Sequence, residues 1–484
     1  MKNLEPPITG NSIKPDLPRP FPGLMIAACL VFLLSLVFAV GTARGLYDDG
    51  SHYFMRILLT GGFNEMVYSR DYVDHLYQLP VVIALKLGIT VISQLQIAFG
   101  IGCFIAWPLT MGMCLWLAPR HFWLVVLACG AGYLNAAYSA VAEHVVAHAF
   151  FWPVCFVIVF VRPLTPVATA MLLGSAAMLL RSYETMLFLG PVLAWLAFRR
   201  AGGEEKSWCR VVFLVAALIL LASAPVALDG TLHPGHGSNA NSFKTGFFGV
   251  LVAPGWTIGW TMFWTALMLA GWWPAVRQII THRLSLTVLA AVILLWGAWP
   301  LLAPADLDPY KQYEARFLDL LVPLGLLGVA LILARRPAWL EAQRNYLVNL
   351  SAGLLLAQSL WHIAATEQWR TYLNVWRGLM AAQPGLVRLM DTPYGKKPTV
   401  GWQATRFVWV GDARNLGLEI SPPKVKSLIL PDYIIYDNTV DRNVVKDFKP
   451  ENLPNLQRYG VDYREYVQAV AHDPILVDRL PQAK

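Results

Sequence analysis

The sequence is poor in charged residues, and none of its few cysteines lies outside the apolar part of the chain. Charged residues make up 14% of the 484 residues, against about 25% in soluble domains, so the chain lacks the polar shell that a soluble protein of this size needs. All six cysteines lie in or beside apolar runs, which leaves neither a disulfide framework nor a CxxC metal site. These shortages indicate a membrane protein.

Common catalytic motifs are also missing. No GxxxxGK[ST], GxSxG, HExxH or GxGxxG motif occurs in a usable context, which argues against nucleotide hydrolysis, serine hydrolysis, zincin proteolysis and dinucleotide redox chemistry. The net charge of +8 does not indicate nucleic acid, because the basic residues stand in short loops or are balanced by acids and form no basic face. We interpret the charge as a determinant of membrane topology.

Long apolar runs, in contrast, are abundant. Residues 24–43 carry no charge, and twenty helical residues at about 1.5 Å each cross a hydrocarbon core of roughly 30 Å. This run is too long for the core of a cleaved signal peptide, so we expect it to stay as the first span. Further runs occur at 97–117, 122–140, 145–161, 165–180, 184–198, 211–228, 247–270, 284–303, 317–334 and 345–365.

These runs predict an α-helical polytopic membrane protein with about 11 transmembrane helices. The runs at 165–180 and 184–198 are short, so two short spans and one broken helix both stay open. Basic residues concentrate in the segments that face inside when the N-terminus is cytoplasmic, as the positive-inside rule requires. We therefore expect a multi-pass protein of the bacterial inner (plasma) membrane.

This orientation divides the chain into three parts. Residues 1–23 form a cytoplasmic tail, residues 24–365 form the transmembrane domain with a first outer loop at 44–96, and residues 366–484 lie outside. The last part is richer in charge and begins with an apolar helical stripe. Strand-like segments follow at 406–410 and 428–436. The pattern predicts a small C-terminal α/β extracytoplasmic domain.

The first outer loop carries two adjacent carboxylates, Asp48 and Asp49. Such a pair can take the proton of an acceptor hydroxyl, since close like charges help raise the pKa of one member; the alternative is a polar loop that caps a helix. His52 and His75 can join carboxylates as metal ligands, but their spacing matches no metal motif and favours solvated histidines. Residues 80–92 are apolar but too short to cross, as in a helix at the outer interface.

Glu143 stands at a predicted outer helix end, where a carboxylate is costly unless it faces water, protein or ligand. His144 and His148 share one helix face, which permits metal binding or acyl transfer, but an interhelical histidine pair is the better interpretation. Arg181 and Glu184 are three residues apart. They can pair with each other or line a site.

Lys311, Tyr313 and Arg316 precede a late span on the same predicted side. Arginine suits a phosphate because its planar fork donates two parallel hydrogen bonds; the alternative is an interfacial anchor. Together, the candidate residues place carboxylates and cations at the lipid boundary on one side of the membrane. That pattern fits a lipid-phosphate substrate.

With these features, residues 24 to about 365 resemble the GT-C superfamily of integral-membrane glycosyltransferases. The likeness rests on a retained first span, Asp48-Asp49 in a long first outer loop, an interfacial helix entered through a proline, Glu143 at the third outer turn, Arg316 before a late span, and an external C-terminal domain. The nearest likeness is to polyprenyl-phosphate-sugar-dependent members, such as bacterial aminoarabinose transferases and protein mannosyltransferases. Gln78-Leu79-Pro80 stands where those relatives often show His-Pro-Pro.

The resemblance implies inverting transfer of a sugar from a polyprenyl-phosphate-linked donor to an acceptor hydroxyl on the outer face. It implies Asp48 or Asp49 as the base, Glu143 as a group that holds donor or acceptor, and Arg316, with Lys311 or Arg181, as the binder of the leaving phosphate. His52, Glu184 and Tyr313 complete the expected binding residues. The expected partners are a lipid-linked sugar donor, a glycan, lipid or protein acceptor, and membrane lipids. The cofactor is unknown, with no metal motif and with a divalent cation still open.

Three other functions stay open. The first is a multipass lipid-linked-sugar transporter or flippase, the second is a membrane-embedded acyltransferase that uses His144 or His148, and the third is a non-catalytic envelope assembly subunit whose tail docks a partner. A transporter is expected to place ionisable residues near mid-span and to use broken helices in both halves. Here the charges cluster at the predicted outer ends, which favours the enzyme.

Overall fold

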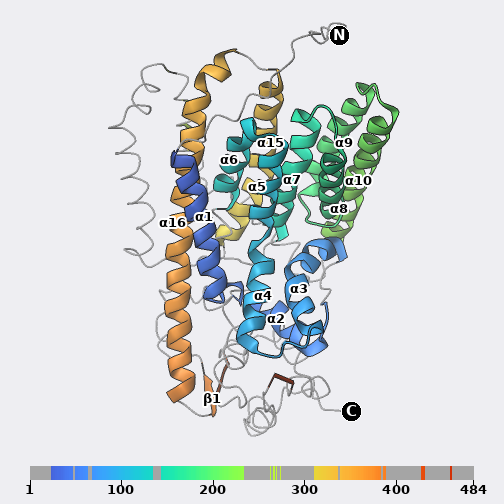
Figure 1. Ribbon diagram of the computed structural model, residues 1–484. Coiled ribbons are helices and arrows are strands. Elements are labelled where there is room, and N and C mark those ends of the chain that lie inside the picture. The colour runs from blue at the N-terminus through green and yellow to red at the C-terminus, as the bar shows by residue number, and fades with distance from the viewer. Residues whose placement is uncertain are drawn as a thin grey trace.

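The computed structural model describes residues 23–46, 49–63, 68–133, 143–233, 310–335, 338–382, 385–388 and 427–430, with Arg458, Tyr459 and a few single positions between 262 and 273. Some side chains within its helices lie outside the described part. The structure is a bundle of helices that run roughly side by side (Figure 1). The α-helices are α1 (Gly23–Gly41), α2 (Asp49–Thr60), α3 (Asp71–Lys86), α4 (Ile92–Phe104), α5 (Ala106–Leu117), α6 (Phe122–Tyr133), α7 (Glu143–Phe160), α8 (Pro166–Leu180), α9 (Met186–Gly202), α10 (Ser207–Leu232), α15 (Tyr310–Ala334) and α16 (Ala338–Ala382).

Short elements connect some of these helices. Three 3₁₀ turns are η1 (Arg44–Leu46), η2 (Tyr68–Arg70) and η3 (Pro119–His121), and the strands are β1 (Gly385–Arg388) and β2 (Ser427–Leu430). Local sequence accounts for several boundaries. At α8, for example, the Thr165 hydroxyl accepts a hydrogen bond of 3.2 Å from the Ala168 amide, and Pro166 occupies the first turn. Both features favour a helix start.

The expected helical membrane architecture is supported, but eleven complete spans are not. Four helical segments are long and apolar enough to cross a membrane: Gly23–Gly41, Glu143–Phe160, Ser207–Leu232 and Arg344–Thr371. A fifth is reached if α4 and α5, which meet at 45°, count as one bent span. Helices also occupy the runs near 122, 165, 184 and 317, but their apolar stretches are shorter. The runs at 247–270 and 284–303 lie almost entirely outside the described residues.

The spans differ in how far protein surrounds them. In α7, 89% of the span is buried inside the protein, whereas only 33% is buried in α1 and in α10. A helix that is apolar all round needs an apolar environment on every side. Protein supplies that environment for α7, and we assign the exposed apolar faces of α1 and α10 to lipid. The helix α7 is therefore surrounded by the other helices, and its first residue is Glu143.

The first outer loop folds into α2 and α3 at the end of the bundle where α1 finishes (Figure 1). The expected interfacial segment at 80–92 is the second half of α3, which begins earlier, at Asp71, and includes Pro80. Its Leu79, Ile83 and Leu87 are exposed, whereas the opposite side lies against α4. At Gly102 of α4, a Cβ atom would collide with the backbone of α3, so glycine permits this close contact.

The predicted boundary at residue 366 falls inside a continuous helix, since α16 runs without a break from Ala338 to Ala382. Beyond it, the described part of the tail contains β1 and β2, which pair in parallel with Gly385 opposite Ser427. The expected strand at 406–410 lies outside the described residues, and β2 covers only the start of the one expected at 428–436. The described residues do not support a C-terminal α/β domain.

Candidate functional site

The candidate site is built around η2, which stands between α2 and α3 in the first outer loop. Ser69 of η2 packs against Gly230 of α10, where a Cβ atom would overlap the Ser69 side chain. The next residue, Arg70, consequently faces the ends of α7 and α9 rather than solvent. Asp71 and Asp74 follow in the first turn of α3, where carboxylates are favoured by the helix dipole.

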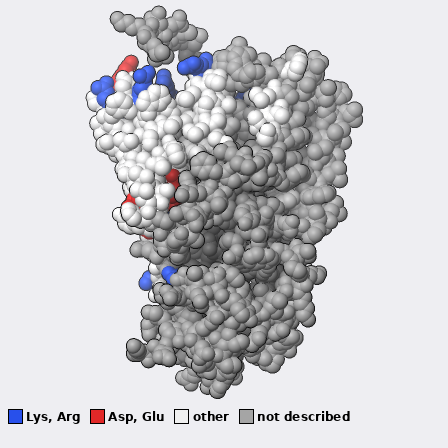
Figure 2. All heavy atoms as spheres, turned by 180° about the vertical axis from the view of Figure 1, so that it is seen from behind, with Lys and Arg blue, Asp and Glu red and all other residues white. Residues whose placement is uncertain are grey.

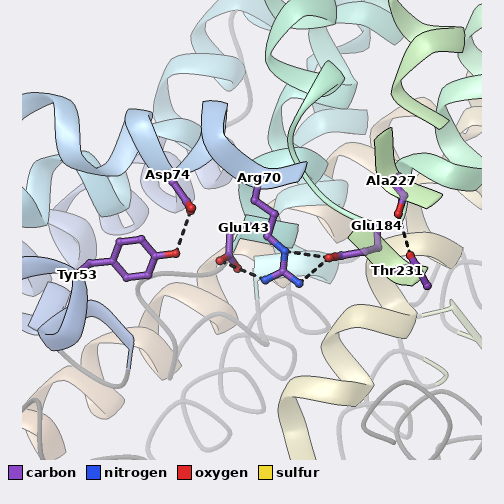
Figure 3. Close-up of polar contacts among 7 residues, drawn as sticks. All are labelled: Tyr53, Arg70, Asp74, Glu143, Glu184, Ala227 and Thr231. Atoms are coloured by element: carbon purple, nitrogen blue, oxygen red, sulfur yellow. Dashed lines mark hydrogen bonds and ion pairs between the residues drawn. The ribbon is translucent and has the colours of Figure 1, made fainter. Parts of the chain in front are cut away.

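Arg70 joins two carboxylates that come from distant parts of the chain (Figure 3). Its Nη2 and Nε atoms lie 2.7 Å and 3.0 Å from Glu184 Oε1, and its Nη1 lies 3.4 Å from Glu143 Oε1. The Arg70 guanidinium also stands 4.8 Å from the centre of the Tyr183 ring. Burial tends to lower the pKa of Arg70, but Glu143 and Glu184 outweigh it and raise that pKa well above its ordinary value. Arg70 is therefore a fixed cation.

Asp74 is fully buried beside this group. The Tyr53 hydroxyl of α2 donates a hydrogen bond of 3.1 Å to Asp74 Oδ1, and Oδ2 has no hydrogen-bond partner among the described residues. Burial, then the charge of Glu143, raise the pKa of Asp74 to about 8, although Arg70 and Tyr53 act in the opposite direction. Asp74 therefore holds a proton at neutral pH.

Arg181 forms a second ion pair at the edge of the cluster. Its Nη1 lies 2.9 Å from Asp71 Oδ2, and its guanidinium stacks 3.5 Å from the centre of the Tyr68 ring. Pairing of Arg181 with Glu184 was one of the two interpretations left open by their spacing, and in the structure each instead binds a residue of the η2–α3 segment. Arg181 keeps 21% of its side chain exposed, so this cation borders the surface.

The structure brings some of the predicted site residues together, whereas the side chains of others lie outside the part of the chain that it describes. Glu143, Arg181 and Glu184 lie in one cluster, although they come from different elements. Asp48 lies outside the described residues, and the side chains of Asp49 and His52, on α2, do as well. Lys311, Tyr313 and Arg316 occupy the first turns of α15, but their side chains are likewise outside the described part.

The described rings of the predicted histidines pack against aromatic side chains. The His75 ring packs at 4.7 Å against Phe63, and the His148 ring packs at 5.2 Å against Trp107 of α5. His144 lies 5.5 Å from Tyr183. Within the described part of the chain, no group of three His, Cys, Asp or Glu residues is arranged to hold a metal ion.

Sequence reasoning missed Arg70, Asp74 and Tyr53. Asp71 and Asp74 were not among the predicted site residues, although both are buried. A periodic signal was present, because Asp71, Asp74 and Gln78 are spaced three and four residues apart and therefore share one face of α3. Polar residues at that spacing beside a buried Tyr77 indicate a polar stripe that faces protein.

The arrangement combines acidic, basic and hydroxyl groups at one end of the bundle. Glu143 and Glu184 accept hydrogen bonds, protonated Asp74 can donate one, and Arg181 offers a cation near the surface. Such a set can hold a polyhydroxylated ligand and exchange a proton with it. No protein-family model, curated protein or solved structure matches the chain, so these residues alone bear on function.

Proposed function

We propose that the chain is a membrane-embedded glycosyltransferase of the GT-C type. It transfers a sugar from a polyprenyl-phosphate-linked donor to an acceptor hydroxyl, at the end of the bundle that carries α2 and α3. The observation that carries this proposal is the cluster of four carboxyl groups and two arginines, Asp71, Asp74, Glu143, Glu184, Arg70 and Arg181, which α2, the helix that begins at Asp49, contacts through Tyr53.

In the proposed reaction, Asp48 or Asp49 removes the proton of the acceptor hydroxyl. The acceptor oxygen attacks the anomeric carbon from the face opposite the phosphate, and the bond between that carbon and the phosphate oxygen breaks. Its electron pair leaves with the polyprenyl phosphate. Asp49 is the first residue of α2, one turn before Tyr53, and Tyr53 binds Asp74. This short path supports a base close to the cluster.

Glu143 and Glu184 are suited to hold sugar or acceptor hydroxyls. Arg70 fixes the position of both carboxylates, so their acceptor oxygens are preorganised and lose little side-chain entropy when a ligand binds. This cluster would stay acidic overall, since four carboxyl groups face two arginines. The leaving phosphate therefore needs cations from elsewhere, and we assign it to Arg181 at the rim together with Lys311 and Arg316 of α15.

The membrane orientation in this proposal follows from the charges of the described residues. Figure 2 shows Lys and Arg along the rim opposite the candidate site. The described basic residues of the helix ends and turns at that rim are Arg120, Arg162, Arg199, Arg200, Lys206, Arg210, Arg335 and Arg344. Exposed Trp116, Trp195 and Trp208 lie near them, as in an interfacial aromatic belt. This supports an N-terminus in the cytoplasm and a site on the extracytoplasmic face of a bacterial inner membrane.

The test is release of polyprenyl phosphate by the full-length protein in lipid nanodiscs, with a panel of lipid-linked sugars and hydroxyl acceptors. The Asp48→Asn and Asp49→Asn variants are compared with Asp229→Asn, an exposed carboxylate near the same end of the bundle. General-base catalysis contributes about 10²–10⁴-fold, so one of the first two variants should lose turnover by that factor. The control should keep it.

The outcome separates the enzyme from the other functions. A transporter or assembly subunit would release no polyprenyl phosphate with any donor, whatever its sequence at Asp48 and Asp49. If donors are cleaved but both Asn variants keep wild-type turnover, the chain is an enzyme whose base lies elsewhere. If Asp229→Asn loses activity to the same extent, the effect reflects charge at this end of the protein rather than a base.

A further inference from the structure

The C-terminal part of the chain contacts both ends of the segment that contains Asp49. This segment starts at Thr42, just after α1, and runs through η1 and α2 to Leu58. Trp369 of α16 donates a hydrogen bond of 3.1 Å from Nε1 to the Thr42 carbonyl, and the Tyr459 hydroxyl donates one of 3.3 Å to the Leu58 carbonyl.

Both of these carbonyls belong to helix ends. The last carbonyls of an α-helix have no partner within the helix and must find one elsewhere. At the end of α2, the Gly62 amide, which is four residues after Leu58, donates to the Thr60 hydroxyl at 3.3 Å instead. The hydroxyl of Tyr459 therefore supplies a partner that α2 lacks, and it does so from a position 401 residues further along the chain.

A third contact lies between these two. Arg44 of η1 is buried, and its Nη1 donates to the Thr366 hydroxyl at 2.7 Å and to the His362 carbonyl at 3.2 Å. The preceding residue, Ala43, has a φ of 52°, in the left-handed region that residues other than glycine seldom occupy. Such a conformation persists only where surrounding contacts hold it. Contacts from α16 at Thr42 and Arg44 stand on either side of Ala43.

These contacts are also shielded from water. Thr366, Trp369 and Tyr459 are at most 6% exposed, and the donors and acceptors that they contact belong to buried or partly buried groups. Water competes poorly for a hydrogen bond in such surroundings, and loss of either partner leaves a buried polar group unsatisfied. Each contact therefore constrains the backbone of the segment more than an exposed hydrogen bond would.

We propose that Thr366, Trp369 and Tyr459 form a C-terminal clamp that fixes the η1–α2 segment and so positions Asp49 for the transfer reaction. The clamp gives the C-terminal part of the chain a role in the site without any residue of its own touching the substrate. Its three members are positioning residues. The catalytic part of this inference rests on the proposed function, whereas the mechanical part does not.

The test measures backbone opening and turnover in the same full-length variants. Tyr459→Phe removes one hydroxyl, and Trp369→Phe removes one indole N–H while keeping an aromatic ring. A buried hydrogen bond is typically worth enough to change a local opening equilibrium by about 2- to 10-fold. Amide hydrogen exchange should therefore accelerate by that factor over residues 42–46 in Trp369→Phe and over residues 58–62 in Tyr459→Phe.

The matched control is Ser359→Ala in the same helix, whose hydroxyl bonds only to the Leu355 carbonyl of α16. It should leave hydrogen exchange in both segments unchanged. For the transfer reaction, the clamp variants should lower kcat and leave the donor KM near its wild-type value, because they displace a base rather than remove a binding group.

Hydrogen exchange and turnover test separate parts of this inference. Unchanged exchange in both clamp variants would overturn the clamp, whatever the activity. Faster exchange with unchanged kcat would reduce the contacts to structural ones and overturn their positioning role. If wild-type protein cleaves no lipid-linked sugar while exchange responds as expected, the proposed function fails and the mechanical clamp stands.

Discussion

The two ends of the helix bundle use charged residues in different ways. At the α9–α10 turn, Arg200 pairs with Glu204 one helical turn away at 2.7 Å, and Arg210 donates to the Glu204 carbonyl. At the opposite end, Arg70 and Glu184 are 114 positions apart and Arg181 and Asp71 are 110 apart. The ion pair of the α9–α10 turn joins sequence neighbours, whereas the ion pairs of the candidate site join separate elements.

This difference has an energetic consequence. A pair within one helix or turn forms whenever that helix or turn forms. A pair between η2 and the ends of distant helices exists only after the bundle has assembled. When such a pair is broken, its buried partner is left uncompensated. Substitutions at the candidate site should therefore have larger effects than the same substitutions at the basic rim.

The largest effect on stability is expected for Arg70→Gln. This change leaves Glu143 and Glu184 without their cation in a mostly buried site, which should lower the free energy of unfolding by about 3 kcal/mol. At the basic rim, Arg210→Gln should change it by less than about 0.5 kcal/mol. Chemical denaturation in detergent micelles measures both.

A second variant separates charge from packing at Arg70. Arg70→Gln combined with Glu184→Gln removes one uncompensated carboxylate and should recover a large part of the loss. If Arg70→Gln and Arg210→Gln prove equally mild, the contrast between the two ends of the bundle does not hold.

The next effect is a pH dependence of stability that comes from Asp74. Its pKa is about 8 in the folded protein and about 3.9 when unfolded, so the folded state keeps a proton that the unfolded state has already lost. The stability that this proton confers is fully present below pH 4 and is lost as the pH rises to about 8. Between pH 6 and pH 8 the loss should be on the order of 2 kcal/mol.

Asp74→Asn tests this assignment, because an amide cannot ionise. The variant should match wild-type stability near pH 4, exceed it increasingly from there to pH 9, and show a much flatter pH dependence in thermal unfolding. Glu205→Gln, an exposed position at the basic rim, should keep the wild-type slope. A wild-type slope in Asp74→Asn would mean that another group in the cluster titrates.

Local sequence predicts much of the fold. The uncharged run at 24–43 corresponds to α1, and Thr165-Pro166 marks the start of α8, since these signals depend only on neighbouring residues. The bend between α4 and α5 was not predicted, because the run at 97–117 is apolar on both sides of it. The boundary at residue 366 was placed where the composition changes, and the backbone of α16 continues through that position.

The candidate site shows the same limit. Glu143, Arg181 and Glu184 were found because charges beside apolar helices are costly and therefore conspicuous. Their partners were not found, since the spacing of Arg181 and Glu184 left a local pair and a site role equally open. In the folded chain, η2 and α3 bring Arg70 close to Glu184 and Asp71 close to Arg181. These contacts form instead of a pair between Arg181 and Glu184. Contacts of this kind depend on how helices pack, which one sequence does not reveal.

The smallest effect is expected when lysine replaces arginine, because this substitution keeps the positive charge and removes the planar guanidinium. Arg181 and Arg199 lie at opposite ends of the bundle, and each guanidinium stands over an aromatic ring, at 3.5 Å from Tyr68 and at 5.8 Å from Trp195. Lysine keeps the positive charge at either position but loses the planar fork that binds phosphate through two hydrogen bonds.

Under the proposed function, Arg181→Lys should raise the donor KM about tenfold, a loss of about 1.4 kcal/mol, while kcat changes less. Arg199→Lys, which removes the same stacking far from the site, should leave both constants within about twofold. Equal shifts in the two variants would mean that arginine serves the membrane interface at both ends, and the phosphate would then have to be bound by Lys311 and Arg316 of α15.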